Sequence, residues 1–303
     1  MNPTDSWKTD SKGQALQAEI RARMEVSNRR ARDLIDRGAV EVNGVVADNF
    51  GHRLEVGDEI AVDVNTRSLR VPRRHRDAGL FQMVIEDRHI VVVDKPAGLL
   101  TIPTEAGDAL PTLIEAVTEN FRQRGLKNPK VHIVHRLDRY TSGVLVLARS
   151  YKAAQGLRPQ FEDHTIDRRY QLITDGAPSE DEGTFRHQLF EDKGSLRIFV
   201  ARGGQEGKAA ITHWRVIERF HRHALIEARL QTGRRNQIRV QFAHEGFPLL
   251  GDRKYGEASK IIKRQALHAC RLAFAHPIDG TSIEVERDPP DDFQRALNKL
   301  RGN

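Results

Sequence analysis

The spacing of apolar residues near the start of the chain predicts two short helices. Leu16, Ile20 and Met24 recur every four residues, as on one face of a helix. A second helix is predicted to begin at a Ser27-Asn28 cap and to end at Gly38. Its apolar stripe consists of Ala31, Leu34 and Ile35.

Short strands should follow these helices. Val40 and Val42 alternate with polar residues up to Asn43-Gly44, a strong hairpin signal. A turn at Gly57-Asp58 precedes another alternating segment. We therefore predict a small module of two helices and a sheet over residues 14–64.

The remainder of the chain predicts a linker and then a larger α+β domain. Residues 65–78 are polar and rich in arginine, which is typical of a linker, and residues 79–303 carry the domain. Within it, Val91–Val93 predict a buried strand and residues 111–121 a helix. The run from Gly143 to Ala148 predicts a central strand that is covered on both faces.

Composition narrows the class of protein. The chain has 303 residues, of which 30% are charged, and no apolar run long enough to cross a bilayer. The first residues lack the apolar core of a secretory signal. A single cysteine, Cys270, rules out an intrachain disulfide and fits the reducing cytoplasm. It also excludes cysteine-rich metal centres.

The formal charge of +7 favours a polyanionic partner, and its distribution matters more than its size. Arginines gather over residues 21–37, 67–76 and 229–239, and the last two stretches contain no acidic residue. A guanidinium can donate two parallel hydrogen bonds to a phosphate. One such cluster alone is most simply a solvated face, whereas three of them favour RNA.

A polar loop that leads into an apolar strand carries the strongest chemical signal. In HRLDRYTSG, from residue 135 to 143, Asp138 stands between Arg136 and Arg139. Loops anchored on rigid strands often hold catalytic groups. A surface ion pair is the commoner outcome for such a triplet, and spacing alone leaves both interpretations open.

The order of several motifs resembles the RluA-type pseudouridine synthases. The loop HRLDRYTSG has the pattern of that family's signature, and VVDKPAGLLTIP precedes it. RRYQLITDG, LQTGRRNQIRVQFAHEGFPLLGDRKYG and ALHACRLAFAHP follow in the family's order. Together these blocks cover most of residues 81–277. The resemblance implies a large, mainly antiparallel mixed β-sheet flanked by helices and loops.

The resemblance also implies roles for particular residues in turning uridine into pseudouridine. Asp138 would be the catalytic carboxylate, Arg234 its paired arginine and Tyr170 a ring stacked on the uracil. Arg136 would fill the gap left by the extruded base. Further substrate contacts are expected from Leu267, Arg139 and Thr141. Whether the carboxylate attacks the sugar, attacks the base or removes a sugar proton stays open.

The first module resembles the S-four-like RNA-binding domain, in the stretch SNRRARDLIDRGAVEVNG and the VGDEI that comes later. RNA contacts are expected from Arg29, Arg30, Arg32, Arg37 and Arg235. The partner implied is ribosomal RNA, with transfer RNA as the alternative, and we expect a monomer. A generic two-helix cap is the competing interpretation of this module.

Two positions depart from the family pattern: Asn236 and Gln241 stand where histidines are usual. They put local RNA contacts or supporting hydrogen bonds in question. No phosphate-loop, dinucleotide-binding or metal-ligand pattern is present, so we expect neither cofactor nor metal. Two rival functions are an inactive RNA-binding or ribosome-assembly factor and a hydrolase of the base–sugar bond. The hydrolase would need a second carboxylate beside Asp138.

Overall fold

The computed structural model describes residues 4–36, 39–47, 52–64, 80–103, 112–192 and 197–302. The predicted linker 65–78 and the predicted helix end at Gly38 lie outside these ranges. Contacts divide the chain into two compact units, residues 1–75 with 83–91 and residues 76–82 with 92–303. No helix in the described ranges has the length and apolar character needed to span a bilayer.

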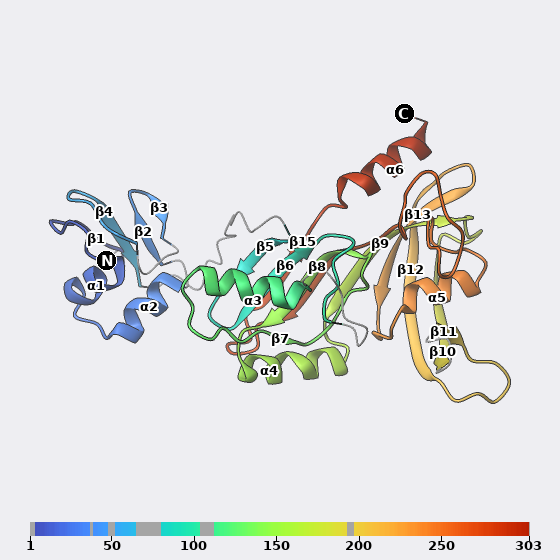
Figure 1. Ribbon diagram of the computed structural model, residues 1–303, viewed down its shortest axis with the longest axis horizontal. Coiled ribbons are helices and arrows are strands. Elements are labelled where there is room, and N and C mark those ends of the chain that lie inside the picture. Colours follow the sequence, from blue (N-terminus) through green and yellow to red (C-terminus); the bar gives the residue numbers. More distant parts are fainter. Residues whose placement is uncertain are drawn as a thin grey trace. The chain divides into compact units, whose positions relative to one another are not determined.

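The N-terminal part is a four-stranded sheet with two helices (Figure 1). Its elements are β1 (Thr4–Lys8), α1 (Leu16–Arg23), α2 (Asn28–Asp36), β2 (Val40–Val42), β3 (Val45–Val46) and β4 (Glu59–Asp63). The strands lie in the order β1-β4-β2-β3. Asn43 and Gly44 both adopt positive φ, as a tight hairpin turn between β2 and β3 requires.

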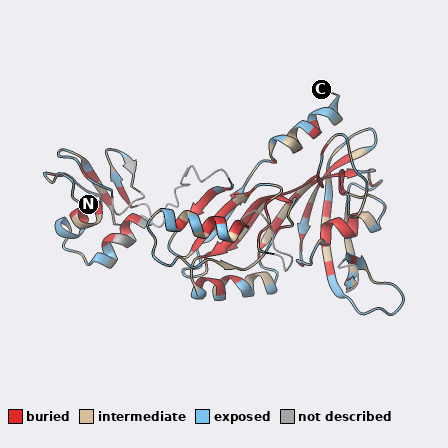
Figure 2. Cartoon of the chain, viewed as in Figure 1, coloured by how far each residue is buried: buried red, intermediate tan, exposed pale blue. Residues whose placement is uncertain are grey.

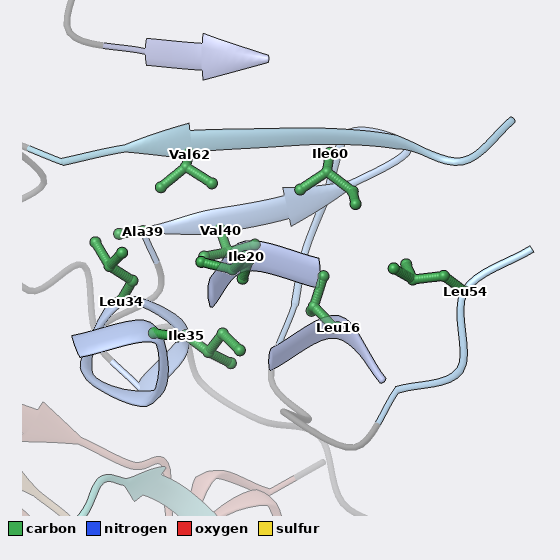
Figure 3. Close-up of a cluster of buried hydrophobic side chains, with 10 residues drawn as sticks. Leu16, Ile20, Leu34, Ile35, Ala39, Val40, Leu54, Ile60 and Val62 are labelled. Atoms are coloured by element: carbon green, nitrogen blue, oxygen red, sulfur yellow. The ribbon is translucent and has the colours of Figure 1, made fainter. Parts of the chain in front are cut away.

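The predicted apolar positions of this module form its core (Figure 3). Leu16 and Ile20 of α1 and Leu34 and Ile35 of α2 are buried against the sheet, and Met24 packs at the edge of the cluster. Strand β1 was not predicted, because its sequence TDSWK is largely polar. It is held by antiparallel pairing with β4 along its whole length.

The larger sheet has eleven strands and carries the helices α3 (Leu113–Gln123), α4 (Tyr151–Glu162), α5 (Gln237–His244) and α6 (Asp291–Arg301) as connections or terminal elements. Nine strands follow one path: β11 (Arg197–Val200), β10 (Glu182–Asp192), β12 (Lys208–Arg219), β13 (His223–Leu230), β9 (Asp167–Asp175), β14 (Leu267–Ala275), β8 (Ser142–Ala148), β6 (Ile90–Lys95) and β5 (Gln82–Glu86). In addition, β15 (Ser282–Glu286) pairs with β14 and β7 (His132–Ile133) pairs with β8. Strands β8 and β14 pair in parallel, whereas β9 pairs with both β13 and β14 in antiparallel fashion, as a mixed α+β fold predicts.

The centre of this sheet is buried on both faces (Figure 2). Every residue of β8 is buried, which confirms the predicted central strand. At its start, Gly143 has φ +116° and faces Ala269 of β14. A Cβ atom there would lie 2.2 Å from the Ala269 carbonyl oxygen, so only glycine permits this spacing of β8 and β14.

Helices α4 and α5 cover different parts of the sheet. Helix α4 contacts β7, β8 and β14, whereas α5 contacts β10 and β11. Helix α3 begins at Leu113, where the Thr112 backbone N–H donates to the Glu115 carboxylate at 2.8 Å. Position 111, the start predicted from the sequence, lies outside the described residues.

Candidate active site

The loop that holds Asp138 is fastened to the loop that follows β6. Thr101 donates from its hydroxyl to the Leu137 carbonyl at 2.8 Å and accepts from the Leu137 N–H at 3.3 Å. The Gly98 N–H donates to the Arg139 carbonyl at 2.8 Å, and the Arg139 Nε donates to the Gly98 carbonyl at 3.1 Å. These paired bonds fix the backbone on either side of Asp138.

A buried lysine donates hydrogen bonds to both of these loops. Lys95 is fully buried, and its Nζ donates to the carbonyls of Pro96, Leu99 and Arg139 at 2.8–3.1 Å. Burial lowers the pKa of Lys95 to about 7, while the negative charge of Asp138 acts in the opposite direction. Only the ammonium form has three N–H groups for three carbonyls, so the hydrogen-bond geometry favours the charged state.

Asp138 is held through one of its two oxygens. Its Oδ2 accepts hydrogen bonds from Nη1 of Arg239 at 2.9 Å and from Nδ2 of Asn236 at 2.6 Å. Among the described residues no donor reaches Oδ1. The carboxylate is thus oriented by two donors and keeps one oxygen available for chemistry.

Arg239 is clamped between two carboxylates. Its Nε and Nη2 donate to both oxygens of Asp252 at 2.7 and 2.8 Å, while its Nη1 serves Asp138. Burial alone would lower the pKa of Arg239. The hydrogen bonds that Arg239 donates to Asp252, together with the charge of Asp138, more than offset burial and raise this pKa. A planar guanidinium with donors on two edges suits this arrangement.

The predicted partnership between Asp138 and Arg234 is wrong in this structure. Arg234 lies in the turn before α5, and its Nε donates to the Ala209 carbonyl of β12 at 3.0 Å. Arg239, five positions later in the same motif, occupies the place beside Asp138. Arg234 nevertheless lines the same cavity as Asp138.

Asn236, which stands where the family pattern has a histidine, is part of the site. It caps α5 with φ +55°, a left-handed conformation that asparagine tolerates better than most residues. Its amide nitrogen donates to Asp138, and its Oδ1 accepts from the Tyr255 hydroxyl at 3.2 Å. The sequence flagged this position as unusual but did not show that it touches the carboxylate.

Gln241, the second departure, is fully buried and serves the scaffold. Its Oε1 accepts from the Thr212 hydroxyl at 2.6 Å, and its Nε2 donates to the Ala210 carbonyl at 3.0 Å. The amide nitrogen also lies 3.2 Å from Nδ1 of His187. Gln241 therefore joins α5 to β10 and β12.

A cavity of about 590 Å³ opens in front of Asp138. Tyr170 and Leu267 line it, from the neighbouring strands β9 and β14. Burial raises the pKa of Tyr170; the charge of Arg168 opposes that shift and the charge of Asp138 adds to it. The phenol is therefore held in its neutral form.

Of the other residues predicted to contact the substrate, two line the cavity and one does not. Arg136 lines the cavity with an exposed side chain, and no described residue forms a hydrogen bond or ion pair with it. Thr141 also lines the cavity, but it is buried and its N–H donates to the Asp138 carbonyl at 3.1 Å. Arg139 is not a cavity residue, and its substrate contact stays a prediction.

The predicted RNA contacts are described only in part. Arg30 on α2 is exposed, whereas the side chains of Arg29 and Arg32 and all of Arg37 lie outside the described part of the chain. Arg235 forms an ion pair with Glu191, 2.6 Å between Nη1 and Oε1. The RNA contacts of these arginines stay predictions.

One group within the described residues has donor atoms close enough for a metal ion: His187, His244 and Glu245. The Gln241 amide nitrogen faces Nδ1 of His187, and Nε2 of the same histidine lies 2.9 Å from Oε1 of Glu245. Because the partners of Gln241 fix its amide as a donor, Nδ1 accepts and Nε2 carries the proton. This pattern explains the group as a hydrogen-bonded cluster.

Comparison with known proteins agrees with this architecture. Residues 89–244 match the family model described as RNA pseudouridylate synthase, and residues 20–60 match the S4 domain. A protein of Zymomonas mobilis named ribosomal large subunit pseudouridine synthase D is 35% identical over 291 residues, which are 91% of this chain and 90% of that protein.

Two further likenesses extend over most of the chain. A Bacillus subtilis protein named uncharacterized RNA pseudouridine synthase YlyB is 35% identical, covering 88% of this chain and 87% of its own. The solved structure of human RNA pseudouridylate synthase domain containing 4 superposes with a TM-score of 0.60 at 22% identity, over 72% of this chain and 92% of that one, which supports the fold. The chain belongs to the RNA pseudouridine synthase family, with an S4 domain near its N-terminus.

Proposed function

We propose that this enzyme isomerises uridine in large-subunit ribosomal RNA, with Asp138 as its catalytic carboxylate. The observation that carries the proposal is that the described residues hydrogen-bond only one oxygen of the Asp138 carboxylate. Oδ2 is fixed by Arg239 and Asn236, while no described residue donates to Oδ1 at the wall of the cavity. A fixed carboxylate with one free oxygen can act as a nucleophile or as a base.

The cavity suits a base that has left its stack. The opening of RNA at one nucleotide costs a few kcal/mol, and a contact that fills the vacated space lowers this cost. Arg136 is the candidate for that place, because its side chain is exposed at the cavity and forms no hydrogen bond or ion pair with any described residue. Tyr170 and Leu267 offer an aromatic and an apolar surface for the extruded uracil.

The choice of RNA rests on the relatives. The name of the Zymomonas mobilis protein specifies the large ribosomal subunit, and its likeness extends over 91% of this chain. The S4 domain and the net charge of +7 suit a large structured RNA. Mapping pseudouridines in cells with and without the gene tests this choice: loss of a site in transfer RNA alone would refute it.

The role of Asp138 can be tested by tritium release. Ribosomal RNA tritiated at carbon 5 of uracil should lose tritium to water with the wild-type protein and not with Asp138→Asn. The expected loss is at least ~10³-fold, because the amide can neither attack carbon nor take a proton. Asp291→Asn, on the exposed first turn of α6, is the control and should match wild type. Equal release from Asp138→Asn and wild type would remove Asp138 from the reaction.

A further inference from the structure

A positive charge without a counter-charge lies in the wall of the active-site cavity. Arg168, two residues before Tyr170 on β9, is only 7% exposed and lines the cavity. No described residue forms a hydrogen bond or an ion pair with its guanidinium, and its Nε is buried without a partner. The buried Arg239 and Arg264, by contrast, are each paired with aspartate.

This arrangement is unfavourable in the free protein. Removal of an ion from water is strongly unfavourable unless a partner compensates for the lost hydration. The guanidinium carbon lies 5.5 Å from the Phe161 ring centroid, and such a cation–π contact compensates for only part of the lost hydration. An anionic group within the cavity would supply the missing partner.

The position of the guanidinium is bounded on two sides. Phe161 lies beside it, and Gly233 lies so close that an added Cβ would be 2.6 Å from Nη1 of Arg168. Gly233 and Phe161 also line the cavity, as does Asp138. The charge is therefore held at the wall that a bound nucleotide would meet.

The reaction itself produces a suitable anion. When the C1′–N1 bond breaks, its electron pair remains with the base, and the detached uracil carries negative charge spread over N1, O2 and O4. The C1′–C5 bond then forms, C5 loses its proton, and N1 takes up a proton. If a carboxylate instead adds to C6, electrons move towards C5 and O4. Negative charge thus develops on the base by either route.

We propose that Arg168 donates hydrogen bonds to a carbonyl oxygen of the uracil and stabilises the negative charge that the base carries during isomerisation. This inference rests on the proposed function. Because the uracil of the bound substrate is neutral, the interaction strengthens only as the charge develops. Such groups increase the rate of the chemical step more than the affinity for substrate.

The test compares full-length variants in single-turnover reactions on tritiated large-subunit ribosomal RNA. Arg168→Met should slow tritium release by ~10²–10³-fold and change the Kd for RNA by less than about threefold. Its thermal midpoint should equal or exceed that of wild type, because an uncompensated charge is replaced by an apolar chain. Arg122→Met, on the exposed face of α3, is the matched control and should change neither rate nor Kd.

Gly233→Ala moves the guanidinium without changing its charge. Its added Cβ would displace Nη1 of Arg168, so it should also slow the chemical step. Transcripts made with 2-thiouridine or 4-thiouridine identify the contact, since sulfur is a weaker acceptor than oxygen. One thio substitution should slow wild type and have little further effect in Arg168→Met.

Several outcomes would overturn the inference. A raised Kd with an unchanged rate would mean that Arg168 binds a backbone phosphate, and a lowered thermal midpoint with a proportionate loss of activity would mean a structural role. Thio effects of equal size in wild type and Arg168→Met would rule out the carbonyl contact. If wild type releases no tritium, the proposed function fails. If wild type is active and Arg168→Met keeps its rate, only this inference fails.

Discussion

At the scale of single residues, the sequence pointed to Asp138, whose catalytic role stays a prediction, but paired it with the wrong arginine. Motif order places Arg234 and Arg239 in the same block, and nothing in their spacing shows which guanidinium turns towards Asp138. A bidentate ion pair with Asp252 fixes Arg239 in the orientation that faces Asp138. That contact depends on how the chain folds after α5.

The two arginines should respond differently to the same substitution. Arg239→Met leaves Asp252 buried without its counter-charge, so the free energy of unfolding should fall by roughly 3–5 kcal/mol. Arg234→Met removes one exposed hydrogen bond to a carbonyl, and the expected loss is within about 1 kcal/mol. Urea denaturation of both variants measures the difference. Losses of equal size would contradict the assigned partnership.

At the scale of helices and strands, prediction succeeded where the signal was local. Periodic apolar positions located α1 and α2, and a continuous apolar run located the fully buried β8, because both signals are local in the sequence. Strand β1 was missed, since its partner β4 begins about fifty residues later and its own sequence is polar. The domain limits at residues 14, 64 and 79 stay predictions.

The junction of β8 and β14 offers a test at this scale. Gly143→Ala would force a Cβ to within 2.2 Å of the Ala269 backbone at φ +116°, and we expect a loss of stability on the order of 3 kcal/mol or more. Gly280→Ala has a similar need for positive φ, +72°, but meets open space, so its loss should be about 1–2 kcal/mol. Thermal unfolding of both variants separates steric contact from backbone strain. Equal shifts would mean that strand spacing does not depend on Gly143.

At the scale of the whole molecule, the candidate active site forms because sheet order brings distant segments together. Asp138 precedes β8, Tyr170 lies on β9 and Leu267 begins β14, and these three strands are neighbours in the order β9-β14-β8. Arg239 arrives from α5, which packs on β10 and β11. Strand order cannot be read from apolar spacing, so the family resemblance suggested roles for these residues but not their geometry.

Two histidines near these strands, the half-buried His135 and the buried His268, make the stability of the fold depend on pH. His135 accepts a hydrogen bond from the Val146 N–H at 3.1 Å, and His268 lies between the Ser142 hydroxyl and the Arg287 carbonyl, 3.0 Å from each. Burial lowers the pKa of His135 to about 3 and that of His268 to about 4, from 6.5. Both rings are therefore neutral in the folded protein near neutral pH.

The sign of the effect follows from proton uptake. Above pH 6.5 both histidines are neutral in the folded and unfolded states, so their contribution to stability is fully present. As the pH falls from 6.5 towards 4, the unfolded chain binds protons that the folded chain does not, and each histidine removes roughly 1 kcal/mol of unfolding free energy per pH unit.

Urea denaturation at pH 7.5, 6 and 5 should show this decline. His268→Gln cannot take up the proton and should decline less steeply, by about one histidine's share, whereas the exposed His52→Gln should follow wild type. Identical slopes for His268→Gln and wild type would show that the buried ring is not the group that responds to acid.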